Sequence, residues 1–239
     1  MPIRHDSGIV LRSFPFGEAD RVVVLLSPDN GKLRTVAKGI RKTKSRFGGR
    51  LEPFTHVELV LYEGRNLDTI TQVDAIESFP RLREDLDRVT AASTMLETAD
   101  AVAQENEQSR ALFGLLQNGL RVLEGGPRHP DLVTAYLLHL AGVVGLAPSL
   151  SMCASCGTHT GVTRFSFSGG GAICGSCAVE GTIRIRPGVV QRLADLASAS
   201  LVDLPAPSPD LTGEAMGLAK RFVEHHLDRR LQSMTSMDS

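Results

Sequence analysis

The sequence has no tryptophan and only two tyrosines and nine phenylalanines. Any stacking on nucleobases therefore falls to phenylalanine or arginine. A long apolar run is also missing, because the most hydrophobic stretch, 132–146, is too short to cross a bilayer. The first residues, Met1 to Asp6, contain no apolar core of a signal peptide. These absences lead us to expect a soluble cytoplasmic protein, and the 42% hydrophobic content argues against disorder.

The chain as a whole has little excess charge, with a net charge of −1. The segment 32–50 is nevertheless strongly basic and contains no carboxylate. Its cations are Lys32, Arg34, Lys38, Arg41, Lys42, Lys44, Arg46 and Arg50. Positive charge held on one segment neutralises phosphates and releases their counterions, so the pattern predicts a polyanionic partner. A solvated basic loop without a ligand is the alternative.

The first 80 residues are divided into short apolar segments. These predict β-strands at 9–11, 22–26, 33–37, 54–62 and 67–76, with a hairpin turn at 28–31. Five strands with a long basic connection between the third and the fourth predict an OB-fold barrel, which often binds single-stranded nucleic acid. An SH3-like barrel has a similar number of strands and remains an alternative.

Helical periodicity replaces the strand pattern from Pro80 onward. It predicts a helix through Val102, then helices at 109–124, 130–145, 187–196 and 212–231. The expected fold class is thus α+β, an OB-fold barrel followed by a helical bundle. We expect a nucleic-acid-binding domain at 1–79 and a helical domain at 80–239, with a metal-binding insert at about 150–183.

All four cysteines belong to one pattern, Cys153-x2-Cys156-x17-Cys174-x2-Cys177. Two paired thiolates at this spacing form two knuckles that close a tetrahedron around one Zn²⁺. Two disulfides are the competing interpretation, which reducing conditions and the short spacing disfavour. His159 offers a substitute ligand, but the sulfur set is already complete. Four cysteine ligands leave no open position, so the sequence predicts a structural zinc ion.

The sequence shows no motif of an enzyme. Gly31-Lys32 lacks the upstream glycine and the following Ser or Thr of a phosphate-binding loop. The glycines at 169–171 fit a hairpin tip rather than a dinucleotide-binding turn, and no carboxylate cluster suited to two-metal chemistry stands out. We therefore expect a protein without catalytic residues or a nucleotide cofactor.

The segment from Gly31 to Arg41, continuing through Ser45 to the Leu51–Phe54 stretch, resembles the bacterial recombination mediator family RecO. The earlier stretch Phe16 to Asp20 fits the same family. The order of parts also agrees with it: a barrel, a helical bundle, a four-cysteine insert and closing helices. Within the basic segment, Lys38 and Arg41 match the family's Ala-Lys-Gly-x-Arg element, and the other six cations are our extension from charge and placement.

The resemblance implies a DNA-repair and recombination protein that binds single- and double-stranded DNA and anneals complementary strands. With RecR, it would load RecA onto strands coated by single-strand binding protein, without hydrolysing nucleotides. It also implies a cytoplasmic protein associated with the nucleoid. The low aromatic content and the cation run suit binding that tolerates any base sequence, because phosphate contacts position a strand without reading it.

Two other functions fit the same residues. An RNA-binding or ribosome-associated zinc-ribbon protein would show the same charge and cysteines. A non-catalytic adaptor would join partner proteins through its helices. The last predicted helix carries cations on its outer side, which are either a second nucleic-acid contact or a solvated face. These are Lys220, Arg221, Arg229 and Arg230.

Overall fold

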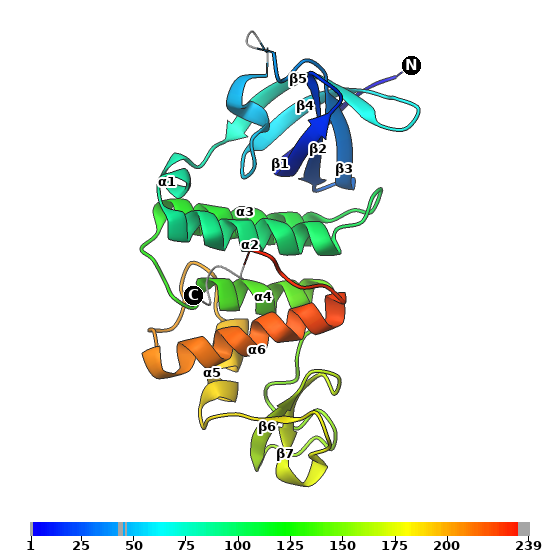
Figure 1. The fold of residues 1–239 in the computed structure, drawn as a ribbon. Helices are drawn as coiled ribbons and strands as arrows, with labels where there is room; N and C mark the ends of the chain where they lie inside the picture. The colour runs from blue at the N-terminus through cyan, green and yellow to red at the C-terminus, as the bar shows by residue number, and fades with distance from the viewer. Residues whose placement is uncertain (1, 43–44, 46, 234–239) are drawn as a thin grey trace. The chain divides into compact units, whose positions relative to one another are not determined.

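The structure is a computed structural model that describes residues 2–42, 45 and 47–233. By its internal contacts the chain divides into two units, Met1–Glu124 and Gly125–Ser239 (Figure 1). The helices that follow the barrel up to residue 124 thus share a unit with it. A domain boundary after residue 79 remains a prediction.

The first unit contains a closed five-stranded barrel. Its strands are β1 (Ile3–Phe16), β2 (Asp20–Ser27), β3 (Gly31–Ala37), β4 (His56–Tyr62) and β5 (Asp68–Glu77). They close in the order β1-β2-β3-β5-β4, with β3 and β5 parallel and the other pairs antiparallel. This Greek-key closure confirms the predicted OB-fold barrel.

Strand β1 is much longer than the segment 9–11 that the sequence predicts. It pairs with β4 over residues 3–9 and with β2 over residues 9–16, and a bulge between Val10 and Arg12 shifts the register of the pairing with β2. A bulge bends a strand and increases its twist, which lets one strand contribute to both sides of the barrel. The polar residues Arg4, Asp6 and Arg12 interrupt the apolar pattern and conceal this length from the sequence.

The barrel core combines strand residues with two residues of the basic connection. Phe47 and Leu51, the latter in the short 3₁₀ helix η1 (Gly48–Leu51), are both 1% exposed and belong to the core cluster. The connection is therefore fixed to the barrel by burial of two large apolar side chains. The strand members of the cluster are Val10, Val23, Leu25, Leu33, Ala37, Val57, Leu59, Leu61, Ile70 and Val73.

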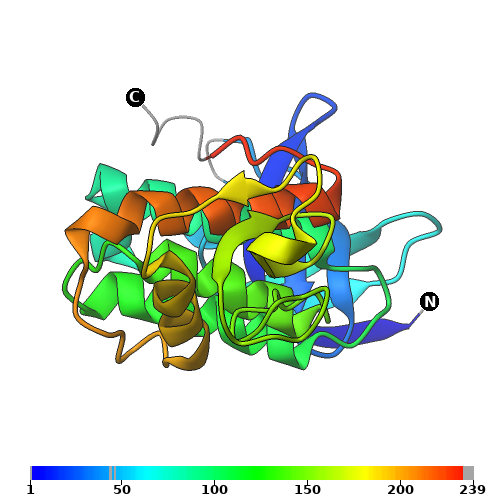
Figure 2. The ribbon, with the colours of Figure 1, turned by 90° about the horizontal axis from the view of Figure 1, so that it is seen from below.

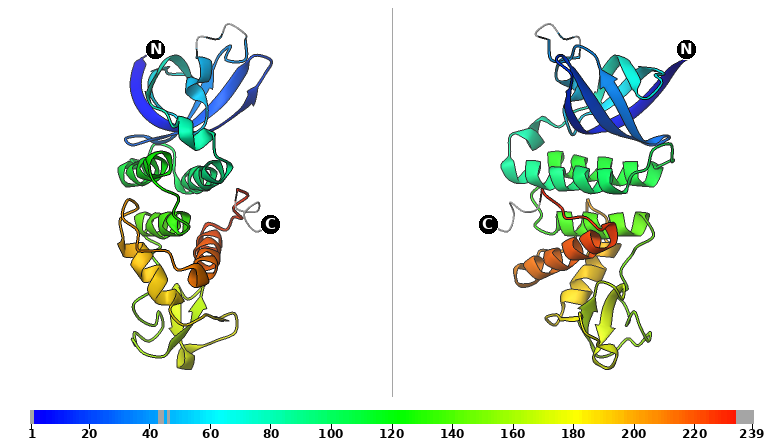
Figure 3. Two further views of the ribbon diagram at one scale, coloured as in Figure 1. Left: turned by 90° about the vertical axis from the view of Figure 1, so that its left-hand side faces the viewer. Right: turned by 45° about the vertical axis from the view of Figure 1, so that its right-hand side comes forward.

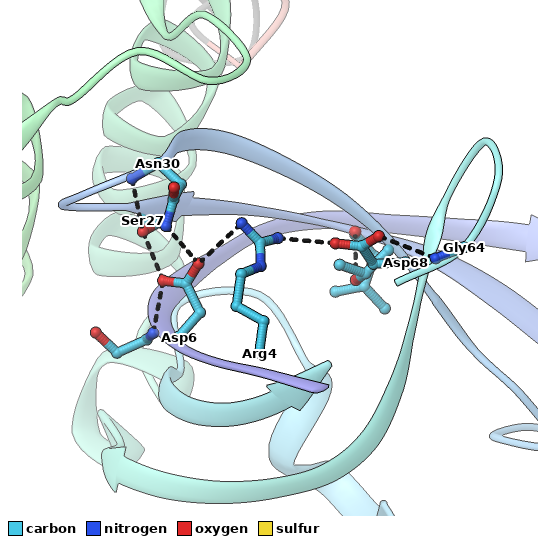
Figure 4. Close-up of polar contacts among 9 residues, drawn as sticks. Arg4, Asp6, Ser27, Asn30, Gly64 and Asp68 are labelled. Carbon is cyan, nitrogen blue, oxygen red and sulfur yellow. Dashed lines mark hydrogen bonds and ion pairs between the residues drawn. The ribbon is translucent and has the colours of Figure 1, made fainter. Parts of the chain in front are cut away.

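A polar network joins the start of β1 to two turns of the barrel (Figure 4). Asp6 accepts hydrogen bonds from the Ser27 hydroxyl (2.7 Å) and from Asn30 Nδ2 (2.9 Å) at the β2–β3 turn. Arg4 donates to Asp68 (2.8 Å), whose other oxygen accepts from the Gly64 N–H (3.3 Å) in the β4–β5 loop. Buried polar groups need such partners, so this network fixes both turns relative to β1.

Three helices complete the first unit: α1 (Pro80–Arg83), α2 (Leu86–Val102) and α3 (Arg110–Gly125). The single helix predicted from Pro80 to Val102 is wrong, because Asp85 interrupts it. The Asp85 carboxylate accepts from the N–H groups of Asp87 (3.0 Å) and Arg88 (3.2 Å), which makes it the N-cap of α2. Helices α2 and α3 run side by side in the unit (Figures 1 and 3).

His56 makes the stability of the first unit sensitive to pH. Burial lowers the pKa of His56 from 6.5, against an opposing effect of Glu77. Below pH 6.5 the unfolded chain binds a proton that the folded unit does not, so stability should fall as the pH drops and level off below the folded pKa. Urea unfolding from about pH 7.5 to about pH 5 measures this. His56→Gln should flatten the profile, and an unchanged profile would contradict the assignment.

The second unit contains three helices and a small sheet. The helices α4 (Leu132–Val143), α5 (Val189–Ser198) and α6 (Pro209–Leu227) contact one another, and α4 is buried on almost every side (Figures 1 and 2). The sheet has the order β7 (Gly171–Cys174), β6 (Val162–Ser166), β8 (Ile183–Arg184), with the 3₁₀ helix η2 (Gly175–Cys177) after β7. In the described part of the chain, every helix is too short or too polar to span a bilayer.

A buried ion pair holds α5 to the start of α4. Arg192 and Asp131 side chains are 7% and 0% exposed, and the guanidinium lies 2.5 Å from the carboxylate. The same guanidinium nitrogen donates to the Pro205 carbonyl (3.2 Å), and the His129 ring lies 3.2 Å from that carbonyl. The proline-rich segment before α6 is therefore packed against the helices at its first residue.

Candidate nucleic-acid interface and metal centre

The outer face of β1, β2 and β3 is the surface that an OB-fold generally uses to bind single strands, together with the β1–β2 and β4–β5 loops. Strand pairing places three rows of residues across this face. From the end near α2 to the β1–β2 turn, the rows are Arg12–Val24–Arg34, Phe14–Val22–Val36 and Phe16–Asp20. One end of the face thus carries cations and its far end has an exposed aromatic residue. Between them, Val22, Val24 and Val36 are buried and not open to a ligand.

The cations near α2 are paired with acids of the protein itself. Lys32 Nζ lies 2.5 Å from the Asp100 carbonyl oxygen and 3.3 Å from its carboxylate, and Arg12 Nε donates to the same carboxylate (2.7 Å). Arg34 lies 3.8 Å from Glu105. Because Asp100 is buried in α2, it holds Lys32 against the helix. The charges of Lys32 and Arg34 are therefore largely balanced within the unit.

The cations near the β1–β2 turn are arranged differently. Lys38, Arg41 and Lys42 are exposed, and none has an acidic partner among the described residues. Gly39 lies between them with a φ of +70°, a conformation that favours glycine. This turn therefore presents three cations to solvent.

The turn is held by the β1–β2 hairpin. The Gly39 N–H donates to the Asp20 carboxylate (2.7 Å), and the Arg41 N–H donates to the Ala19 carbonyl (3.0 Å). The two stretches that carry the resemblance, Phe16–Asp20 and Gly31–Arg41, therefore meet at this point. The backbone that carries Lys38 and Arg41 is fixed, so these side chains are presented without a large ordering cost.

The structure says less about the remaining cations of the basic segment, Lys44, Arg46 and Arg50. Arg50 is exposed and donates to the Phe47 carbonyl (3.4 Å), and it lines a surface hollow with Gln72 and Asp74 of β5. Lys44 and Arg46 lie outside the residues that the structure describes. Their contribution to nucleic-acid binding stays a prediction, as does that of the basic outer side of α6.

Sequence reasoning did not single out two residues of this surface. Phe16 is 50% exposed at the end of β1, and Arg65 is exposed in the β4–β5 loop. Neither belongs to the cation run, so charge counting passes over both. The signal that could have found them is the position of the two loops in an OB-fold, once the strand bounds are known.

The four cysteines lie together in the second unit. Their sulfur atoms all lie within 4.8 Å of one another, and Cys156 Sγ is 3.8 Å from Cys174 Sγ. A tetrahedron with metal–sulfur bonds of about 2.3 Å has sulfur atoms about 3.8 Å apart, whereas a disulfide needs about 2.05 Å. All four cysteines are free, so the geometry fits a metal-binding cluster and excludes the disulfide alternative.

The thiols of the cluster shift one another's pKa. The Cys174 N–H donates to Cys153 Sγ (3.4 Å) and lowers the pKa of Cys153 to about 6. Ser155 lowers the pKa of Cys177, but the thiols of Cys156 and Cys174 outweigh this effect and raise it to about 12. Four thiols this close compete for protons, and a bound cation allows all four to ionise. His159 is exposed and its Nδ1 lies 2.9 Å from the Ser151 carbonyl, so it is engaged outside the cluster.

Together, the closed barrel with an exposed basic turn and the four-cysteine cluster define an OB-fold protein with a candidate metal centre. Comparison with known families matches residues 1–79 to "Recombination protein O N terminal" and residues 83–235 to "Recombination protein O C terminal". The chain belongs to the RecO family of DNA repair proteins.

Curated relatives agree over nearly the whole length. The chain is 46% identical to the DNA repair protein RecO of a Nocardioides species, over 98% of each chain. It is 41% identical to that of Frankia casuarinae, over 100% of this chain and 99% of the relative. It is 39% identical to that of Thermobifida fusca, over 98% of each.

Proposed function

We propose that this protein binds single- and double-stranded DNA through the turn that carries Lys38, Arg41 and Lys42. The observation that carries the proposal is that these cations are exposed and have no acidic partner in the part of the chain that the structure describes, on a barrel whose fold commonly binds nucleic acid. Lys32 and Arg34 contribute less, because Asp100 and Glu105 already balance them. Lys44, Arg46 and Arg50 extend the same surface in the proposal.

The wider role follows from family membership. The protein anneals complementary strands and, with RecR, helps to load RecA onto strands coated by single-strand binding protein. It does so in the cytoplasm at the nucleoid, without catalysing a reaction. A strand that is held by its phosphates keeps its bases available for pairing, which is what annealing requires. A strand-annealing assay with and without coating by single-strand binding protein tests this role.

Replacing Lys38, Arg41 and Lys42 together by alanine should weaken DNA binding and its salt dependence. If each contacts one phosphate, the slope of log affinity against log salt should fall by about 2.7 for duplex DNA and by about 2.1 for single strands. Fluorescence anisotropy with labelled oligonucleotides over a salt series measures this slope. Annealing should slow in the same variant.

A matched control removes three cations that already have acidic partners. Arg110 pairs with Asp29, Arg121 with Glu77 and Arg186 with Glu214. Their combined alanine variant has the same net charge as the test variant, and its slope should stay near that of the wild type. Equal losses in both variants would mean that net charge, not this turn, governs binding. Tighter binding to a matched RNA strand would favour the RNA-binding alternative.

We propose that the four-cysteine cluster holds one structural zinc ion. A set of four thiolates at tetrahedral spacing suits Zn²⁺ and leaves no position for substrate or water. The cluster is also the centre of its lobe, since Cys153, Cys174 and Ile173 form the small buried core there. The metal therefore maintains the lobe and takes no part in chemistry.

A further inference from the structure

We propose that Phe16 stacks on an unpaired base and gives this protein a preference for single strands. The inference rests on the proposed DNA-binding function, which it deepens by assigning a contact to the base. Phosphate contacts at the basic turn are available to a single strand and to a duplex alike. A stacking residue adds binding free energy only where a base is free to leave its neighbours.

The exposure of Phe16 is the first observation that supports this role. Phe16 is 50% exposed, and it is the one phenylalanine of the described chain that is exposed. The others are buried or half-buried, including Phe14 two residues earlier, whose ring lies 5.5 Å from the guanidinium carbon of Arg12. Leaving a large ring in water forgoes the stabilisation that burial brings, so the position is unusual in a chain this poor in aromatic residues.

The place of Phe16 in the fold is the second observation. It is the last residue of β1, directly opposite Asp20 of β2, and its side chain belongs to the outer face of the barrel. The Asp20 carboxylate in turn accepts a hydrogen bond from the Gly39 N–H. This bond holds the turn of Lys38 and Arg41 next to the Phe16–Asp20 pair. The ring therefore lies at the same end of the barrel face as the exposed cations Lys38, Arg41 and Lys42.

The residues around Phe16 indicate that its ligand is a nucleotide. The ring can stack on the base, and the exposed cations nearby can contact the phosphate of the same nucleotide. An apolar peptide would gain little from Lys38, Arg41 and Lys42. Stacking does not depend on which base is present, so this contact is compatible with binding that tolerates any sequence. In a duplex both faces of each base are already stacked on neighbouring bases, so no base face is available to Phe16.

Phe16→Ala should therefore weaken binding to a single strand by at least about fivefold and leave duplex binding within about twofold. Val202→Ala provides the matched control, because Val202 is 72% exposed and belongs to the second unit rather than to the barrel. Anisotropy with one oligonucleotide, alone and annealed to its complement, gives both affinities. Phe16→Leu, which keeps an apolar side chain without a ring, should behave like the alanine variant.

The absence of tryptophan allows a direct readout of stacking. Phe16→Trp introduces a single indole into a chain that has none, and a base stacked on it should quench its fluorescence. A single-stranded oligonucleotide should quench this variant strongly, whereas the Val202→Trp variant should stay unchanged.

Equal losses on single strands and duplex in Phe16→Ala, or an unquenched indole at saturating single strand, would overturn the stacking inference. Either result with wild-type binding and its salt slope intact would leave the proposed function standing. Failure of the wild type to bind any strand would instead remove the proposed function, and stacking with it.

Discussion

Cys174→Ser is expected to abolish metal binding and to unfold the two loops that carry the cysteines, next to β6 and β7. Cys174 is 5% exposed at the end of β7, and its N–H supports the Cys153 sulfur. The part of the lobe around the cysteines has few other apolar contacts, since Val162 and Ile173 are the aliphatic residues packed with them, whereas Phe165 of β6 packs against Phe222 of α6. A core as small as the one at the cysteines cannot hold their loops in place without the metal. The binding free energy of the metal is in this case also folding free energy.

Metal content and amide exchange measure this effect. Wild-type protein should carry one zinc ion per chain, and the Cys174→Ser variant should carry almost none. The Cys153 N–H, which donates to the Thr158 carbonyl (2.7 Å), should lose its protection, while amides of the barrel keep theirs. His159→Ala serves as the control, because His159 lies outside the sulfur cluster and should leave metal content unchanged. Full metal content in the serine variant, or full protection after chelation, would contradict a structural metal.

Arg192→Ala should destabilise the second unit by about 3–5 kcal/mol. The Asp131 carboxylate is fully buried, and loss of Arg192 leaves it without a cation in a medium that solvates charge poorly. The Pro205 carbonyl loses a donor in the same variant, which loosens the segment that leads into α6. Chemical denaturation followed by exchange of amides in α4 and α5 reports the stability of this unit separately from that of the barrel.

Arg186→Ala is the matched control for burial. Arg186 lies 2.6 Å from Glu214, almost the same distance as in the buried pair, but its side chain is 56% exposed. Such a pair contributes about 0–1 kcal/mol, so its loss should be small. The double variant Arg192→Met with Asp131→Leu should recover much of the stability, because it removes both charges together. A small effect of Arg192→Ala, equal to that of Arg186→Ala, would show that the buried pair is not needed.

Local patterns in the sequence were sufficient for most elements. Strands β2 to β5 and helices α3 to α6 lie within a few residues of their predicted positions, because alternation and helical periodicity report which side of an element is buried. The predictions were wrong where the structural environment changes along one continuous apolar segment. Strand β1 changes partner at Ile9, just before its bulge, and the Asp85 cap divides a helix whose apolar pattern is continuous.

The basic segment shows the limit of a charge count. Its eight cations look equivalent in the sequence, but the structure separates Lys32 and Arg34, which face acids, from Lys38, Arg41 and Lys42, which face none among the residues it describes. Asp100 lies 68 residues after Lys32 and reaches it only because α2 packs against the barrel. No spacing rule along the chain predicts such a pair.

The order of strands and helices and the tetrahedral sulfur chemistry of the two cysteine pairs follow from the sequence alone, because residues near one another in the chain determine them. Folding decided which positive charges remain available, how the Phe16–Asp20 turn meets the Lys38–Arg41 turn, and that Arg192 is buried against Asp131. These features depend on contacts between distant segments. Their free energy depends on burial and on the partner, and neither can be read from the residue itself.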